Sequence, residues 1–172
     1  MFRVRRIRVD EGSLLRAMRL AALADAPGDA TTTLDRAVAR DDEHWIAAAE
    51  ANASGSLQAT FFAERGETEE PGPAESGVVG MVGAYANRDG VVNVVGLWTA
   101  PGFRQLGVAS GLLDAVAVWA RDIGAVRLRI WVVERNEHAL RFYADEGFEP
   151  TGSIMPYEPE PAIRQVELVH VI

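Results

Sequence analysis

The sequence predicts an α/β protein in which strands and helices alternate through the second half of the chain. Residues 91–99 are a mostly apolar run of strand length, which suits a strand buried on both faces. Residues 105–123 repeat apolar side chains at three- and four-residue spacing until Gly124, a pattern typical of an amphipathic helix. Residues 126–133 predict a second strand, so a strand, a helix and a strand follow one another.

An N-terminal strand and two helices are expected before these elements. The ranges are residues 2–9 for the strand and residues 14–23 and 34–46 for the helices. Pro27 ends the first helix, and Thr32 or Thr33 is the expected N-cap of the second. We expect the second helix to be broken near Asp41.

Two further strands are expected at residues 58–64 and 77–87, before the central strand. The residues between them, 65–76, contain four glutamates and two prolines. Such a segment buries little apolar surface, so it is expected to be a mobile hairpin loop. Asp89 and Gly90 then make a tight turn into the central strand.

The C-terminal part predicts a helix and two strands. The helix covers residues 137–146 and ends at Gly147, and the strands cover residues 148–154 and 163–172. We expect the last strand at an edge of the sheet, where it offers pairing for a homodimer. A length of 172 residues suits a single domain, residues 1–172.

Composition excludes several classes of function. The net charge of −8 repels phosphate backbones, which argues against nucleic-acid binding; it either attracts a cationic substrate or serves only solubility. The chain has no cysteine, and its three histidines do not lie at ligand spacing, so no metal site is expected. No apolar run approaches the roughly 20 residues that span a bilayer, so no membrane contact is expected and a cytoplasmic location fits.

Chemistry is expected at the turn between the central strand and the long helix, residues 104–109. The free N–H groups of a helix's first turn converge on one point, where the helix dipole adds positive potential. Gly107 lets a ligand approach the backbone closely, Ala109 is small, and Arg104 adds a positive charge. The turn therefore predicts a pyrophosphate site, although it is neither a dinucleotide fingerprint nor a P-loop. A plain strand-to-helix connection is the alternative.

Two blocks of residues resemble the GNAT acetyltransferase family. The family signature Q/R-x-x-G-x-G/A is matched by Arg104, Gly107 and Ala109. A second family pattern, N-x-x-A-x-x-x-Y-x-x-x-G-F, is matched with every spacing kept by Asn136, Ala139, Tyr143, Gly147 and Phe148. The resemblance covers residues 91–152. It implies a mixed, mostly antiparallel central sheet that is flanked by helices and splays where acetyl-CoA enters.

The resemblance implies acetyl-CoA as the cosubstrate. Backbone N–H groups of the turn would take its pyrophosphate, and main-chain groups of Leu97 and Thr99 would pair with its pantetheine arm. The expected cofactor-binding residues are Leu97, Trp98, Thr99, Arg104, Gln105, Leu106, Gly107, Val108, Ala109, Ser110 and Asn136. The alternative for Trp98 is a position that lines the core or the acceptor pocket. The alternative for Asn136 is the N-cap of a helix.

Tyr143 is the implied catalytic acid, whose hydroxyl would protonate the departing thiolate. The alternative is an aromatic core cluster with Phe142 and Phe148. A backbone N–H near Trp98 or Thr99 would stabilise the oxyanion.

The base that deprotonates the acceptor is where the sequence departs from the family. Many members carry a glutamate on the strand before the turn, but this strand offers only Asn93, and an amide cannot take up a proton. Candidate bases elsewhere are Asp41, Asp42, Glu43, His44 and Glu134. Each is also explained as a solvated surface group, and water acting on a partly neutral amine is the default.

These observations predict an acetyl-CoA-dependent N-acetyltransferase. The acceptor is expected to be a primary amine of a small molecule, rather than a protein N-terminus or lysine, and to attack the thioester directly. One alternative is a non-catalytic acyl-CoA binding or sensing module. A structural domain that has lost the cofactor is a second alternative, against which the two complete blocks argue.

Overall fold

The computed structural model describes residues 1–28, 32–66 and 77–172. Its strands are β1 (Phe2–Arg6), β2 (Gln58–Arg65), β3 (Val78–Ala86), β4 (Val91–Thr99), β5 (Arg127–Val133), β6 (Glu149–Tyr157) and β7 (Glu160–Val171). Its helices are α1 (Gly12–Asp25), α2 (Leu34–Val38), α3 (Asp42–Ala53), α4 (Val108–Asp122) and α5 (Glu137–Asp145), with a short 3-10 helix η1 (Pro101–Phe103).

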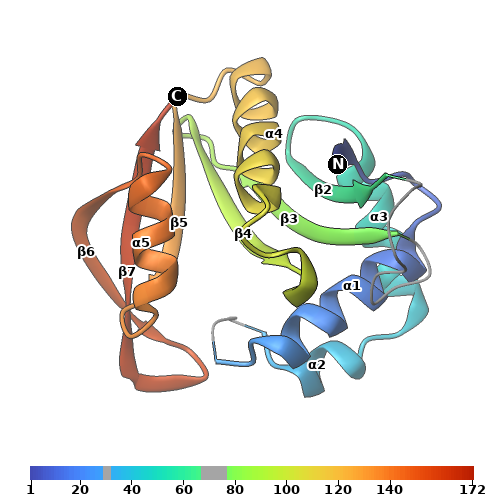
Figure 1. Ribbon diagram of the computed structural model, residues 1–172, viewed down its shortest axis with the longest axis horizontal. Helices are drawn as coiled ribbons and strands as arrows, with labels where there is room; N and C mark the ends of the chain where they lie inside the picture. The colour runs from blue at the N-terminus through green and yellow to red at the C-terminus, as the bar shows by residue number, and fades with distance from the viewer. Residues whose placement is uncertain (29–31, 67–76) are drawn as a thin grey trace.

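The strands of these ranges form one seven-stranded sheet in the order β1-β2-β3-β4-β5-β7-β6 (Figure 1). β4 and β5 are parallel, and the other neighbouring strands are antiparallel. The predicted mixed, mostly antiparallel sheet is therefore confirmed.

Apolar side chains cover both faces of the sheet at β2, β3 and β4. Successive residues of a strand point to opposite faces, and on β2 Phe61 packs toward α4 and α5 while Phe62 packs toward α1 and α3. Trp45 joins the core on the α1–α3 side, and Trp119 joins the core on the α4–α5 side. Strands β2, β3 and β4 are thus the middle of three layers.

The expected break near Asp41 is confirmed, and it divides the predicted second helix into α2 and α3. Thr33 caps α2, because its side chain accepts a hydrogen bond from the Arg36 N–H at 3.3 Å. Asp41 caps α3 by accepting from the His44 N–H at 2.9 Å. A second cap at Asp41 starts a new helix and gives α3 its own direction.

Two expectations differ from the structure. Helix α4 begins at Val108 rather than at residue 105, because Gln105 and Gly107 have φ values of 63° and 80° and are not helical. The prediction of β7 as an edge strand is wrong. The chain reverses after Tyr157, and β7 pairs with β5 on one side and β6 on the other, so the edges are β1 and β6.

The predicted acidic hairpin loop, residues 65–76, lies outside the described residues from position 67 onward. In the described part of the chain, no helix combines the length and apolar character that crossing a membrane requires.

Candidate active site

Strand β4 loses one of its neighbours along its length. Val91, Val92 and Asn93 pair in parallel with β5, and no further pair between these strands follows in the described residues. Figure 1 shows the two strands diverging. On its other edge β4 stays paired with β3, across a bulge where Gly96 has a φ of 60° that favours glycine. Beyond Asn93 the β5-side edge of β4 is therefore left without a strand partner.

The turn after β4 leaves a helix end with unsatisfied donors. No side chain caps the start of α4, and the first helical N–H with a backbone acceptor is that of Gly111, which donates to the Gly107 carbonyl at 3.0 Å. The N–H groups of residues 108–110 therefore have no acceptor within the helix. A Cβ built on Gly107 would meet no atom within 4 Å. Free donors beside open space fit a pyrophosphate.

Arg104 is bound at this turn. Its guanidinium pairs with the Asp25 carboxylate at the end of α1, and its Nε donates to the Thr99 carbonyl at 3.2 Å. Trp98, buried in the core on the α1–α3 side, donates from Nε1 to the same Asp25 oxygen at 2.9 Å. Asp25 thus joins α1, β4 and the turn, a role that no pattern in the sequence marks.

The other two residues expected on the cofactor strand lie beside Trp98. Leu97 is partly buried and packs against the core on the α4–α5 side. The Thr99 hydroxyl is buried and finds no hydrogen-bond partner in the part of the chain that the structure describes. A buried hydroxyl of this kind is open to a bound ligand.

Tyr143 lies on α5 in an aromatic cluster. Its ring meets those of Phe142 and Phe148 edge-on, with centroids 5.2 and 5.4 Å away. The side chain is buried, and burial raises the pKa of its phenol above the ordinary value. The phenol is therefore a neutral hydrogen-bond donor at physiological pH.

The start of α5 shows the helix cap that was the alternative for Asn136. Its Oδ1 accepts from the Ala139 N–H at 3.0 Å. At the other end of α5, Glu146 accepts a hydrogen bond from the Ser110 hydroxyl in the first turn of α4. The two helices that carry the two family blocks are thus joined directly.

Four of the five candidate bases lie on the surface or have other partners. Asp41 caps α3, and Glu134 pairs with Arg164 at 2.9 and 3.0 Å. The exposed carboxylates in the first turn of α3 are Asp42 and Glu43. His44 differs from these four, because it lines a pocket.

The surroundings of His44 favour its neutral imidazole form. Its ring nitrogens lie 3.0 and 3.1 Å from one guanidinium nitrogen of Arg40. Because a guanidinium only donates, the ring nitrogen that receives this bond carries a lone pair. Burial and the charge of Arg40 lower the pKa of His44, and Asp41 opposes them more weakly. The imidazole can therefore accept a proton at neutral pH.

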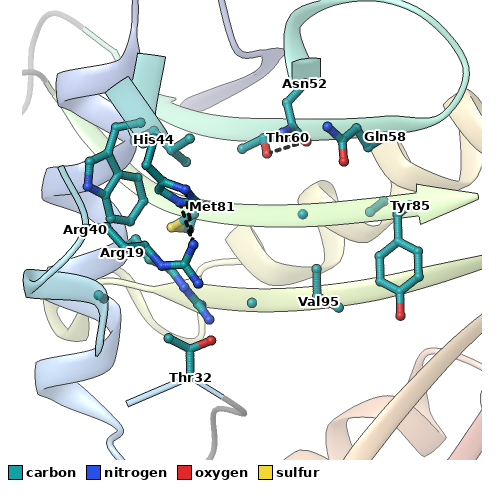
Figure 2. A pocket seen from close by; sticks show the side chains of 16 residues that line it. Arg19, Thr32, Arg40, His44, Asn52, Gln58, Thr60, Met81, Tyr85 and Val95 are labelled. Carbon is teal, nitrogen blue, oxygen red and sulfur yellow. Dashed lines mark hydrogen bonds between the residues drawn. The ribbon is translucent and has the colours of Figure 1, made fainter. Parts of the chain in front are cut away.

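The pocket has a volume of about 330 Å³ and lies between α1, α3 and strands β2, β3 and β4 (Figure 2). Its charged and aromatic side chains are Arg19, Arg40, His44, Trp45 and Tyr85. Amide and hydroxyl groups come from Asn52, Gln58 and Thr60. On β4 it reaches Val95 and Gly96, which directly precede Leu97. The pocket and the unpaired edge of β4 therefore meet at the bulge.

The model of the acetyltransferase (GNAT) family matches residues 19–148. The chain belongs to the GNAT acetyltransferase family. The family and the fold that the sequence predicted are therefore confirmed. As a member of this family, the protein is an acyltransferase that uses acetyl-CoA as its cosubstrate.

Individual GNAT relatives extend this comparison. An uncharacterized N-acetyltransferase of Mycobacterium tuberculosis (strain ATCC 25618 / H37Rv) is 29% identical over 111 residues, or 64% of this chain and 71% of the relative. The mycothiol acetyltransferase of Parafrankia sp. (strain EAN1pec) is 30% identical over 152 residues; these are 87% of this chain but only 46% of that enzyme. The crystal structure of an N-acetyltransferase from Thermoplasma acidophilum with coenzyme A superposes with a TM-score of 0.70 at 13% identity, covering 97% and 98% of the two chains.

The sequence patterns did not identify Arg19 and Arg40, the two arginines of the pocket in this GNAT chain. Arg19 follows Leu15 by four residues and Met18 by one, so it interrupts the buried stripe of α1. A charged residue inside an apolar stripe is a signal that would have identified it. Arg40 lies in the connection between α2 and α3. Residue spacing predicts which side chains share a face of a helix or strand, but it does not predict where a side chain in a connection points.

Proposed function

We propose that this GNAT acetyltransferase transfers the acetyl group of acetyl-CoA to a primary amine of a small molecule, by direct attack of the amine on the thioester. One observation carries the proposal: the pocket reaches β4 at Gly96, next to the strand edge that is free to pair with the pantetheine arm. A volume of about 330 Å³ suits a small acceptor.

The cofactor would be held by the chain's own backbone. The N–H groups of residues 108–110 would bind its pyrophosphate, and main-chain groups of Leu97 and Thr99 would pair with its pantetheine arm. Bound in this way, acetyl-CoA supplies the activated acetyl group. The unpaired β4 edge and the uncapped start of α4 support this arrangement.

Two side chains would assist the reaction, one as a base and the other as a hydrogen-bond donor. His44 takes the proton that the amine loses, because among the five candidate bases it is the one in the pocket. Tyr143 donates a hydrogen bond to the departing sulfur, since its phenol stays neutral. The positive charges of Arg19 and Arg40 would lower the pKa of a nearby ammonium group, so that a weak base suffices.

Calorimetric titration with acetyl-CoA tests the cofactor site. Gly107→Trp should fill the open space at the start of α4. Gly124→Trp is the matched control, because Gly124 also has a positive φ, of 82°, and a Cβ there also meets nothing within 4 Å. We expect micromolar binding, about −8 kcal/mol, for the wild type and the control and none for Gly107→Trp.

A panel of small amines then tests the reaction, with thiol release as the readout. Turnover with at least one amine supports the enzyme assignment. Tight binding of acetyl-CoA without turnover on any amine would favour the non-catalytic acyl-CoA module. Absence of acetyl-CoA binding by the wild type would contradict both.

A further inference from the structure

Arg19 carries a partly buried charge that no acid neutralises within the described chain. One of its terminal nitrogens packs against β4, 2.8 Å from where a Cβ on Gly96 would lie. It has neither a hydrogen bond nor an ion pair with any residue the structure describes. Burial, followed by the charge of Arg40, lowers the pKa of its guanidinium. A charge held out of water without a partner is unfavourable for the protein alone.

Three of the other partly buried arginines show how such a charge can be satisfied within this chain. Arg5 bonds to both Glu11 and Glu64, at 2.6 to 2.8 Å. Arg129 donates to Asn93 and pairs with Glu167. Arg6 donates to three backbone carbonyls. Within the described chain, Arg19 has neither a carboxylate, an amide nor a backbone carbonyl as a hydrogen-bond partner. This points to a partner from outside the chain.

The pocket around Arg19 has a positive character. Figure 2 shows Arg19 and Arg40 reaching into it between His44 and Thr32. No aspartate or glutamate is found among its described lining residues. The whole chain has a net charge of −8, so this positive charge is local. Two guanidinium groups facing a cavity without a carboxylate form a site for an anion.

We propose that Arg19 and Arg40 bind a carboxylate of the acceptor, so that the substrate is an amine that also bears a carboxylate, as an amino acid does. This inference rests on the proposed function and names the substrate class of the same site. The planar guanidinium donates two parallel hydrogen bonds to a carboxylate, which fixes the position of the substrate.

The position of Arg19 also limits the length of the acceptor. Arg19 contacts Gly96, which directly precedes Leu97 on the strand proposed to hold the pantetheine arm. A carboxylate on Arg19 is therefore close to that strand. An acceptor whose amine is separated from its carboxylate by one or two carbon atoms suits this geometry, and the side chain then lies toward Trp45 and Met81.

The kinetic test uses pairs of acceptors that differ only in charge: a panel of α- and β-amino acids and their carboxamides. We expect the wild type to favour the acids by about tenfold or more in kcat/KM, as for a hydrogen bond to a charged group. Arg19→Gln should remove most of this preference, chiefly through KM, because the contact is made before and during the reaction. Arg19→Lys should retain part of it.

Arg121→Gln is the matched control. Arg121 is an exposed arginine in the last turn of α4, on the other side of the sheet from the pocket. We expect this variant to keep the wild-type preference for acids. An equal loss of preference in Arg121→Gln and Arg19→Gln would overturn the assignment of Arg19.

A binding readout separates this inference from the proposed function. With coenzyme A alone as the reference, adding N-acetylated amino acids as well should raise the melting temperature of the wild type and of Arg121→Gln further, but not that of Arg19→Gln. Their N-acetylated amides should give no further rise in any of the three proteins. Without ligand, Arg19→Gln should melt no lower than the wild type, because the substitution removes an unpaired charge.

The outcomes are distinct. Turnover with equal use of acids and amides would overturn the carboxylate site and leave the proposed function intact. A shift produced by the acids alone, with no turnover on any amine, would support the site and contradict the proposed function. A larger shift with aminophosphonates than with amino acids would overturn the carboxylate assignment, as would the absence of any charge-dependent shift.

Discussion

Asn93 is the long polar side chain of β4, the strand on which many GNAT members carry a glutamate. Its amide is 4% exposed and accepts a hydrogen bond from the Arg129 Nε at 2.8 Å. The pocket offers another way to obtain a neutral amine. Two guanidinium groups lower the pKa of an ammonium group bound near them, and a carboxylate on Arg40 competes for the donor that contacts His44. Binding of the acceptor would thus release the lone pair of His44.

His44→Gln should lower kcat and remove the acid limb of the pH–rate profile. Burial and Arg40 hold the pKa of His44 below the usual imidazole value of about 6.5. The base is therefore present above that depressed pKa and is lost by protonation as the pH falls through it. Measuring kcat/KM from about pH 5 to 8 tests this expectation.

Arg40→Gln provides the comparison for the same profile. Removing the positive charge beside the ring should raise the pKa of His44, so the acid limb should move to higher pH but remain visible. An acid limb that persists unchanged in His44→Gln would exclude His44 as the base.

Tyr143→Phe should lower kcat by about 10- to 100-fold, the range expected for one hydrogen bond to a charged group. Burial raises the pKa of Tyr143 above about 10, whereas thiols titrate near 8.5. Full proton transfer to the thiolate is therefore uphill, so the role that we propose for the hydroxyl is that of a hydrogen-bond donor. Phenylalanine keeps the contacts with Phe142 and Phe148, so the melting temperature should stay near that of the wild type. Undiminished turnover in chemistry-limited conditions would rule out this role.

At the scale of elements, α3 brings His44 and Trp45 to the pocket, and its start depends on Asp41. Asp41→Ala should lower the free energy of unfolding by about 1 kcal/mol, because the His44 N–H loses its acceptor. Asp41→Asn keeps an equivalent cap and removes only the charge. Urea denaturation of the three proteins tests this. A loss in Asp41→Asn as large as in Asp41→Ala would show that the charge stabilises α3 rather than the cap.

Local pattern predicted most elements of this fold. The apolar run of β4, the helical periodicity of α4 and the cap at Asp41 each depend on neighbours in sequence. The start of α4 was misplaced because Gln105 adopts a positive φ that its residue type does not reveal. The place of β7 was misjudged because strand order depends on contacts between distant segments.

The cofactor side of the candidate site could be predicted from the sequence, whereas the pocket could not. The turn at Gly107 and the helix with Asn136 and Tyr143 are continuous segments, so a motif could place them. The pocket combines side chains from α1, α3, the α2–α3 connection and three strands. Arg19 and Arg40 are 21 positions apart, and only the packing of α1 against α3 brings them to one cavity.

At the scale of the whole molecule, one sheet supplies both cores. β2, β3 and β4 each contribute buried side chains to the α1–α3 side and to the α4–α5 side. Detachment of either helical layer would expose the apolar face of these strands that it covers. The predicted single domain, residues 1–172, therefore implies that the two faces unfold together.

Two variants change how strongly each face of the sheet contributes to the fluorescence signal of unfolding. Trp45→Phe removes a tryptophan from the core on the α1–α3 side, and Trp119→Phe removes one from the core on the α4–α5 side. In urea, we expect fluorescence and far-ultraviolet circular dichroism to give one shared midpoint for the wild type and one for each variant. Acetyl-CoA should raise each midpoint as a single transition, because a ligand bound to the folded state stabilises the entire cooperative unit. A first transition that gives a larger fluorescence change in the Trp119→Phe protein than in the Trp45→Phe protein would mean that the α1–α3 layer unfolds by itself, and the single-domain prediction would then be wrong.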